Sequence, residues 1–189
     1  MSRNSVVYDA CVLFPNYLRD LLIRLAINGK FRARWTEQIL DECFRSILAK
    51  RPDLREAQLE RTRDFMNRAI PDVLVENYES LIDGLTLPDP NDRHVLAAAI
   101  RAGAQVIVTW NLRDFPEEAL MPYGIEAQSP DEFVLQLLDL NPAVVREAVE
   151  EQAKVLRKPP MTFLELTEVL GNNGLTRSAD YLSSIGEGE

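Results

Sequence analysis

The sequence of 189 residues has room for one ordinary domain with a sizeable core and a small appendage. Its composition, 46% hydrophobic and 27% charged, is typical of a globular protein and argues against a disordered chain. The formal net charge of −9 argues against simple nucleic-acid binding by the chain as a whole. The two cysteines and the single histidine form no CxxC or Cys/His cluster, which argues against structural zinc and a disulfide framework.

The charge is unevenly distributed along the chain. From Arg19 to Arg68, twelve Lys/Arg stand against eight Asp/Glu, so this stretch carries +4 and the remainder carries −13. A pair of solvated helix faces is the simplest interpretation of the basic stretch. The first ten residues contain no apolar signal region, and no run approaches the roughly 18 apolar residues of a membrane span. We therefore expect a cytoplasmic location, reduced thiols and no membrane segment.

The first half of the chain alternates between strand and helix patterns. Residues 6–8 predict a buried strand, and apolar residues at helical spacing predict a helix from Pro15 to Gly29. The following expected elements are a short strand at 31–35, a helix with Thr36 as its N-cap, a charged helix at 54–69 and a strand at 72–76.

A helix that stops at Gly103 and a β-branched strand at 106–109 complete the alternation. The pattern predicts an α/β fold, with a central parallel sheet covered by helices on both faces. After about residue 128 only helix signals remain, including a capping box at Ser129 and another at Thr162. We expect an α/β domain over 1–130 and an all-helical extension over 131–189.

Acidic and amide side chains gather at one edge of the expected sheet. Asp9 ends the first strand, Asn111 and Asp114 follow the strand at 106–109, and Asp89 and Asp92 open the helix before it. The carboxyl ends of parallel strands share one edge, where active sites collect. Carboxylates repel one another unless a cation neutralises them, and oxygen-only sites suit Mg²⁺ or Mn²⁺. Such a site can support in-line phosphoryl displacement.

Each candidate also has a structural interpretation. Asp9 and Asp89 could be N-caps, and Asp92, in the first turn of its helix, could interact favourably with the helix dipole. Glu42 lies opposite the apolar stripe of its helix, where solvated glutamates are common. His94 could act as a base, but a histidine at the surface or boundary is the expected interpretation. Trp35 and Trp110 flank the rim, where packing is a simpler role than base stacking.

Four segments resemble the motifs of PIN-domain ribonucleases, in particular the VapC toxins of bacterial toxin–antitoxin pairs. They are "VVYDACVL" with Asp9, "TEQILDECFRSIL" with Glu42, "DPNDRHVLAAAIRAGAQVIVT" with Asp92, and "VTWNLRDF" with Asn111 and Asp114. The likeness covers residues 6 to about 128 and implies a PIN-like three-layer fold. The helical tail is similar to an extension carried by one subgroup of these toxins.

The resemblance implies a metal-dependent endoribonuclease. Asp9, Glu42, Asp92 and Asp114 would hold one or two Mg²⁺ or Mn²⁺ ions, and a bound water would cleave RNA to leave 5′-phosphate and 3′-hydroxyl ends. Its further expectations are a supporting role for Thr109 and Asn111, a phosphate contact by Arg113, RNA contacts along the basic stretch, a cognate antitoxin and often a toxin homodimer.

Two other classes of protein compete with this interpretation. A phosphatase of the haloacid-dehalogenase type needs an aspartate where Cys11 stands, and a receiver domain needs a lysine after a late strand, where "WNLRDF" has none. Both are disfavoured. The departure at Asn111 leaves open a catalytically weak or inactive PIN-fold module that binds RNA or protein, and it also leaves open whether Asn111 or Asp114 completes the fourth acidic position.

Overall fold

The computed structural model describes residues 4–29 and 31–186, and its centre is a parallel sheet. Within these residues the sheet has the order β2-β1-β3-β4. Its members are β1 (Ser5–Tyr8), β2 (Arg32–Arg34), β3 (Ala104–Val108) and β4 (Glu126–Gln128). All three pairings are parallel, so the carboxyl ends of the strands share one edge.

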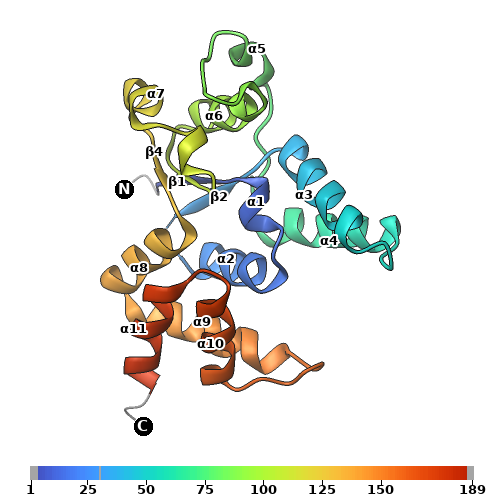
Figure 1. Cartoon of the computed structure of the whole chain (residues 1–189), viewed down its shortest axis with the longest axis vertical. Helices are drawn as coiled ribbons and strands as arrows, with labels where there is room; N and C mark the ends of the chain where they lie inside the picture. Colours follow the sequence, from blue (N-terminus) through green and yellow to red (C-terminus); the bar gives the residue numbers. More distant parts are fainter. Residues whose placement is uncertain (1–3, 30, 187–189) are drawn as a thin grey trace.

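Helices cover both faces of this sheet, as the alternating pattern predicted. In Figure 1, α5 and α6 lie above the sheet and α2 lies below it, which confirms the three-layer α/β arrangement. The helices of the described residues are α1 (Ala10–Leu13), α2 (Asn16–Asn28), α3 (Glu37–Lys50), α4 (Glu56–Ala69), α5 (Glu79–Ile82), α6 (Arg93–Arg101), α7 (Glu117–Leu120), α8 (Pro130–Leu140), α9 (Pro142–Val155), α10 (Phe163–Asn172) and α11 (Thr176–Gly186).

Local signals explain where several helices begin. The Thr36 hydroxyl accepts a hydrogen bond from the amide of Ile39 and caps α3. Ser129 and Thr162 form the predicted capping boxes at the starts of α8 and α10. These side chains satisfy backbone donors that have no partner inside their own helix, so each boundary is set by a few neighbouring residues.

Two short segments differ from the sequence-based expectation. The strand predicted at 72–76 is wrong, because this segment forms only an isolated parallel bridge between Trp35 and Leu74. Asp72 and Asn77 flank it with φ values of 55° and 59°, a left-handed backbone that interrupts an extended ladder at both ends. The edge strand β4 was not predicted, since its sequence "EAQ" lacks β-branched and aromatic residues.

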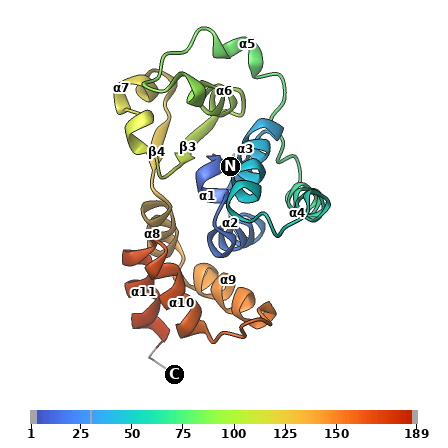
Figure 2. The same cartoon turned by 45° about the vertical axis from the view of Figure 1, so that its right-hand side comes forward.

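The C-terminal helices form a group below the α/β part in Figures 1 and 2. They share its core, since Phe133 of α8 makes edge-on contacts with the rings of Tyr8 and Phe31. In addition, the side-chain amide of Gln152 on α9 donates to the carbonyl of Tyr17 on α2 at 2.9 Å. The expected boundary between 1–130 and 131–189 stays a prediction, and residues 187–189 lie outside the described part. No helix in the described ranges combines the length and apolarity that crossing a membrane requires.

Candidate functional site

Asp9 is fixed at the carboxyl end of β1 by its own chain and by the neighbouring strand. Its amide donates to the carbonyl of Val108 at 3.1 Å, which ties it to the end of β3. One carboxylate oxygen accepts from the amide of Ala10 at 2.7 Å, so Asp9 is the N-cap of α1. The other accepts from the Thr109 hydroxyl at 2.7 Å. Asp9 is therefore an N-cap, as its structural interpretation allowed, and also a buried carboxylate, only 5% exposed, at the predicted edge.

The loop after β3 is bonded to the same carboxylate. Thr109 is buried, and its hydroxyl accepts from the amide of Asn111 at 3.0 Å while it donates to Asp9. The Cys11 thiol donates to Asp9 at 3.1 Å and accepts from the amide of Trp110 at 3.3 Å. Burial, then the charge of Asp9, raises the pKa of Cys11 to about 12, so the thiol remains a neutral donor. Thr109 and Cys11 thus orient Asp9.

Glu42 on α3 meets the histidine of α6. Its Oε1 lies 3.0 Å from Nε2 of His94, and its side chain is 35% exposed. His94 is only 2% exposed, so the expectation of a surface or boundary histidine is wrong. Neither of its ring nitrogens has a hydrogen bond to another side chain or backbone group in the described part of the chain. Glu42 is thus not a freely solvated glutamate, because its carboxylate lies against a buried imidazole.

Asp92 lies at the junction of the 3-10 turn η1 (Pro90–Asp92) and α6, and its side chain makes no capping hydrogen bond. Burial, followed by the charges of Asp9, Asp89 and Asp114, raises the pKa of Asp92 to about 6, while His94 acts in the opposite direction. Asp89 itself caps η1 by accepting from the amide of Asn91 at 2.8 Å. The carboxylates of Asp9, Asp89 and Asp114 therefore lie close enough to Asp92 to disfavour its negative charge.

A pocket of about 450 Å³ brings the separate segments together. Asp9 after β1, Glu42 of α3, Asp92 before α6 and Asn111 after β3 all line it. Its remaining lining residues are Ala10, Cys11, Phe14, Ser46 and Lys50. Three of the four predicted acids therefore share one cavity.

Asp114 and Arg113 do not line this cavity. Asp114 ends the 3-10 turn η2 (Leu112–Asp114), and its charge still contributes to the raised pKa of Asp92. Arg113 is exposed. At the pocket itself the fourth position is occupied by Asn111, so the two residues left open by the sequence have different surroundings.

The donor set suits a hard divalent cation. The polar lining of the pocket consists of carboxylate, amide and hydroxyl oxygens with one thiol and one ammonium group. In the described ranges no group of three His, Cys, Asp or Glu side chains is close enough to hold an ion directly. Mg²⁺ commonly binds through one or two carboxylates and completes its coordination with several waters. The spacing of these side chains does not fit a closed structural zinc site.

Lys50, Ser46 and His94 were not recognised as site residues from the sequence. Glu42, Ser46 and Lys50 are four residues apart along α3, a spacing that places side chains on one helix face, so the signal was present. The Lys50 ammonium lies 4.8 Å from the ring centre of Phe14 at the same pocket. No local pattern indicates that His94 meets Glu42, because that contact joins two helices distant in sequence.

The basic stretch is partly neutralised within itself. Arg63 pairs with Glu37 and Asp41 across α3 and α4. Arg51 pairs with Asp53, and Arg24 with Asp20. Three of the twelve basic side chains of this stretch are therefore already paired with acids of the same stretch.

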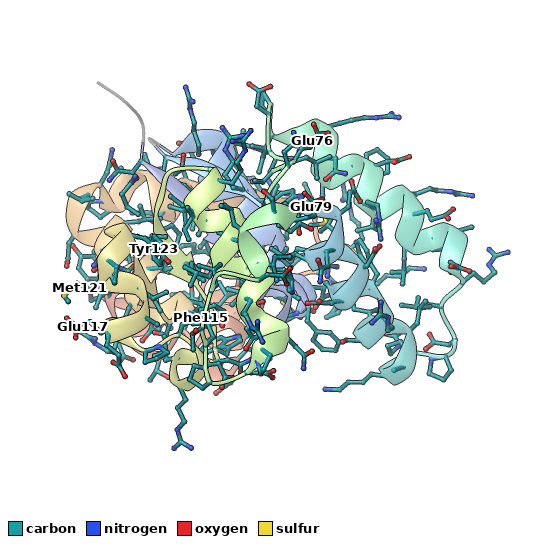
Figure 3. The ribbon with its side chains drawn as sticks, turned by 90° about the horizontal axis from the view of Figure 1, so that it is seen from above. Glu76, Glu79, Phe115, Glu117, Met121 and Tyr123 are labelled. Atoms are coloured by element: carbon teal, nitrogen blue, oxygen red, sulfur yellow. The ribbon has the colours of Figure 1, made fainter. Side chains whose placement is uncertain are left out.

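A larger pocket, about 700 Å³, lies elsewhere and contains none of the predicted acids. Phe115, Glu117 and Met121 line it, and Figure 3 shows them on the opposite side of the view from α3 and α4. Glu117, Glu126 and Glu132 are the acids of this larger pocket, and none of them was predicted at the carboxyl ends of β1 and β3. The smaller pocket lies at that edge of the sheet and is the candidate site.

Comparison with known families agrees with this geometry. The family described as PIN domain matches residues 5–113. This match covers more than half of the chain and every segment that lines the acidic pocket, and the chain belongs to the PIN-domain family. Its C-terminal helices match a second family, described as VapC50 C-terminal domain, over residues 130–184.

A relative from Mycobacterium tuberculosis, named "Putative ribonuclease VapC50", is 46% identical over 80 residues. The aligned segment spans 42% of this chain and 47% of that protein, so the likeness covers about half of the relative's length. No solved structure matches the chain.

Proposed function

We propose that this protein is a metal-dependent endoribonuclease that hydrolyses RNA phosphodiester bonds. The observation that carries the proposal is the convergence of Asp9, Glu42 and Asp92, from three separate segments, on one pocket. Membership of the PIN-domain family and the ribonuclease name of the mycobacterial relative support the same activity.

In this proposal Asp9, Glu42 and Asp92 hold Mg²⁺ or Mn²⁺, and Asn111 or Asp114 completes the set. Such a cation, when bound, would activate water and neutralise charge that develops on the phosphate. Thr109 keeps the Asp9 carboxylate in place through its 2.7 Å hydrogen bond. Asp92 must be ionised to act as a ligand, and its raised pKa means that metal binding and proton loss are coupled.

RNA is the proposed substrate despite the net charge of −9. Lys50 is the one cation among the residues that line the pocket, and Phe14 beside it offers an aromatic face. A phosphate contact by Lys50 and a base stacked on Phe14 would orient a single strand over the acids. Arg113, exposed after β3, is a candidate for a second phosphate contact.

We further propose that the protein is the toxin of a toxin–antitoxin pair, with a cognate antitoxin as its partner. The support is the VapC50 C-terminal match and the VapC name of the relative. The homodimer expected from the family resemblance stays a prediction.

A non-catalytic PIN-fold module is the second candidate. It is favoured by Asn111, since an amide stands at the pocket where a fourth carboxylate is expected. The two candidate functions predict different affinities for divalent cations. A nuclease must bind the cation, whereas a site with a neutral amide in place of a carboxylate attracts it less strongly.

RNA cleavage with and without metal tests the proposed function. We expect the purified protein to cut single-stranded RNA in Mn²⁺ or Mg²⁺, to leave 5′-phosphate ends, and to lose this activity in EDTA. Calorimetry on the metal-free protein measures its affinity for Mn²⁺. Absence of both cleavage and cation binding at millimolar metal would support the non-catalytic module instead.

The contact between His94 and Glu42 leads to a separate prediction. Truncation in His94→Ala leaves Glu42 without its buried neighbour, so we expect Mn²⁺ affinity to fall by about 10–100-fold, the usual effect of losing a group that orients a ligand. His94→Gln places an amide donor near the same carboxylate and should recover part of the loss. Calorimetry measures both variants. Wild-type Mn²⁺ affinity in His94→Ala would show that Glu42 needs no such support.

A further inference from the structure

The C-terminal helices contact Trp110, a residue in the loop of the acidic pocket. This tryptophan lies between Thr109, which bonds to Asp9, and Asn111, which lines the pocket. The edge of its indole ring lies against the backbone of Gly174, in the turn that joins α10 to α11. In Figure 1 this turn, in dark red, is at the end of the helix pair nearest the sheet.

Gly174 is required at this place for two independent reasons. Its φ of +104° is a conformation that L side chains rarely adopt. A Cβ at this position would lie 2.5 Å from the Cη2 atom of Trp110 and 3.2 Å from Cζ2 and Cζ3. Gly124, by contrast, has a positive φ of +66° but nothing within 4 Å of such a Cβ. The space at Gly174 is therefore filled specifically by the indole ring.

The turn behind Trp110 is firmly held. The amide of Leu175 donates to the carbonyl of Leu170 at 3.1 Å, and the Leu175 side chain is buried. Asp131 of α8 accepts from the amide and the hydroxyl of Ser178 at 2.9 and 2.7 Å, which anchors the start of α11. The surface that Trp110 contacts is thus a fixed part of the C-terminal helices.

The loop on the other side of Trp110 is held from within. The amide of Trp110 donates to Cys11 and the amide of Asn111 donates to Thr109, and both acceptors bond to Asp9. The amide of Thr109 also donates to the carbonyl of Gln128 at 3.0 Å, which ties the loop to β4. Trp110 is 37% exposed, and the contact of its indole ring with Gly174 restrains the loop from the side of the C-terminal helices. A loop restrained on both sides can hold Asn111 and Thr109 in one geometry.

We propose that Gly174 seats Trp110 and that this contact makes the C-terminal helices a positioning element of the acidic pocket. They hold the 109–111 loop against Asp9. The proposal rests on the proposed function in so far as the loop serves RNA cleavage. It assigns a role to the C-terminal helices that does not require them to touch RNA or metal.

The test compares Gly174→Ala with Gly124→Ala in the full chain. Both changes place a side chain at a positive φ, but only the first adds a Cβ against Trp110. With 5-fluorotryptophan, the two tryptophans give two fluorine resonances, which Trp110→Phe assigns. We expect Gly174→Ala to move the Trp110 resonance and to speed hydrogen exchange of the Asn111 amide, with the Trp35 resonance unchanged. Gly124→Ala should leave all three at wild-type values.

RNA cleavage rates test whether the contact between Gly174 and Trp110 affects activity. We expect kcat to fall by about 10–100-fold in Gly174→Ala and to stay at the wild-type value in Gly124→Ala, because a small misplacement of a positioned group carries a penalty of this size. An unmoved Trp110 resonance, or a moved one with wild-type Asn111 exchange and cleavage, would overturn the proposal. If the wild type does not cleave RNA, the proposed function fails, while the resonance and exchange still decide whether the contact holds the loop.

A folding defect in Gly174→Ala can be separated by a second variant. Trp110→Ala removes the ring and leaves the turn intact, so it should speed Asn111 exchange and lower cleavage in the same way. Wild-type values for both measurements in folded Trp110→Ala would overturn the proposal by themselves.

Discussion

Asp9→Asn is expected to lower metal-dependent RNA cleavage by about a thousandfold or more. The Asp9 carboxylate is buried between β1 and β3, where it accepts from a backbone amide, a hydroxyl and a thiol. Asparagine has the same shape but no charge, and its amino group would face donors that need an acceptor. A cation loses a charged ligand, and several kcal/mol of transition-state stabilisation correspond to about this factor in rate.

The measurement is the cleavage rate of a short RNA in saturating Mn²⁺, together with thermal unfolding of each protein. Asp180→Asn is the matched control, because it removes the same charge from an exposed position on α11. It should cleave at the wild-type rate. Cleavage by folded Asp9→Asn within tenfold of the wild-type rate would mean that the reaction takes place elsewhere on the molecule.

Asp92→Asn is expected to produce two effects of opposite sign: loss of cleavage and a gain in stability of the metal-free protein. The pKa of Asp92 is about 6 in the folded chain, above its ordinary value of 3.8, because burial and neighbouring acids disfavour the charge. The folded state therefore binds this proton more tightly than the unfolded state does. The resulting stabilisation is complete below the ordinary pKa and is lost as pH rises through about 6.

Above that pH the metal-free wild type carries an unfavourable charge that the amide removes. For a fully buried group the shift would correspond to roughly 3 kcal/mol. Asp92 is partly exposed, so after allowance for solvent screening we expect roughly 1 kcal/mol, or about 2–4 °C in Tm at neutral pH. The gain should vanish at about pH 4. Mn²⁺ should raise the Tm of the wild type more than that of Asp92→Asn, since the cation neutralises the carboxylate.

Cleavage by the wild type should fall as pH drops through about 6 and should persist to lower pH when more metal is present, because cation and proton compete for Asp92. The measurements are thermal unfolding in EDTA at several pH values and RNA cleavage rates over the same pH range. Asp83→Asn, an exposed change, is the control. A lower Tm for metal-free Asp92→Asn than for the wild type at pH 7 would contradict the assigned repulsion.

The parts of the fold that the sequence predicted are those fixed by neighbouring residues. Thr36 and Ser129 bond to amides three residues ahead, so the boundaries of α3 and α8 follow from local sequence. Asp9 was placed correctly because a strand leads directly into it. The 72–76 segment was misjudged, since its apolar composition suits a strand while the backbone at Asp72 and Asn77 does not.

The parts of the site that the sequence could not predict depend on contacts between distant segments. Glu42 looked solvated because the pattern of α3 describes only α3, whereas its neighbour His94 comes from α6. Trp110 looked like ordinary packing, and nothing near Gly174 indicates that the two residues meet. Such contacts follow from tertiary packing, which overrides local preference.

The edge-on packing of Phe133 against Tyr8 and Phe31 bears on how this protein can be divided. The two family matches end at 113 and begin at 130, which invites expression of the nuclease part alone. A chain cut in that interval would leave large apolar rings of the sheet layer facing water. The two family matches divide the sequence, but they do not divide the hydrophobic core, which contains residues from both matched segments.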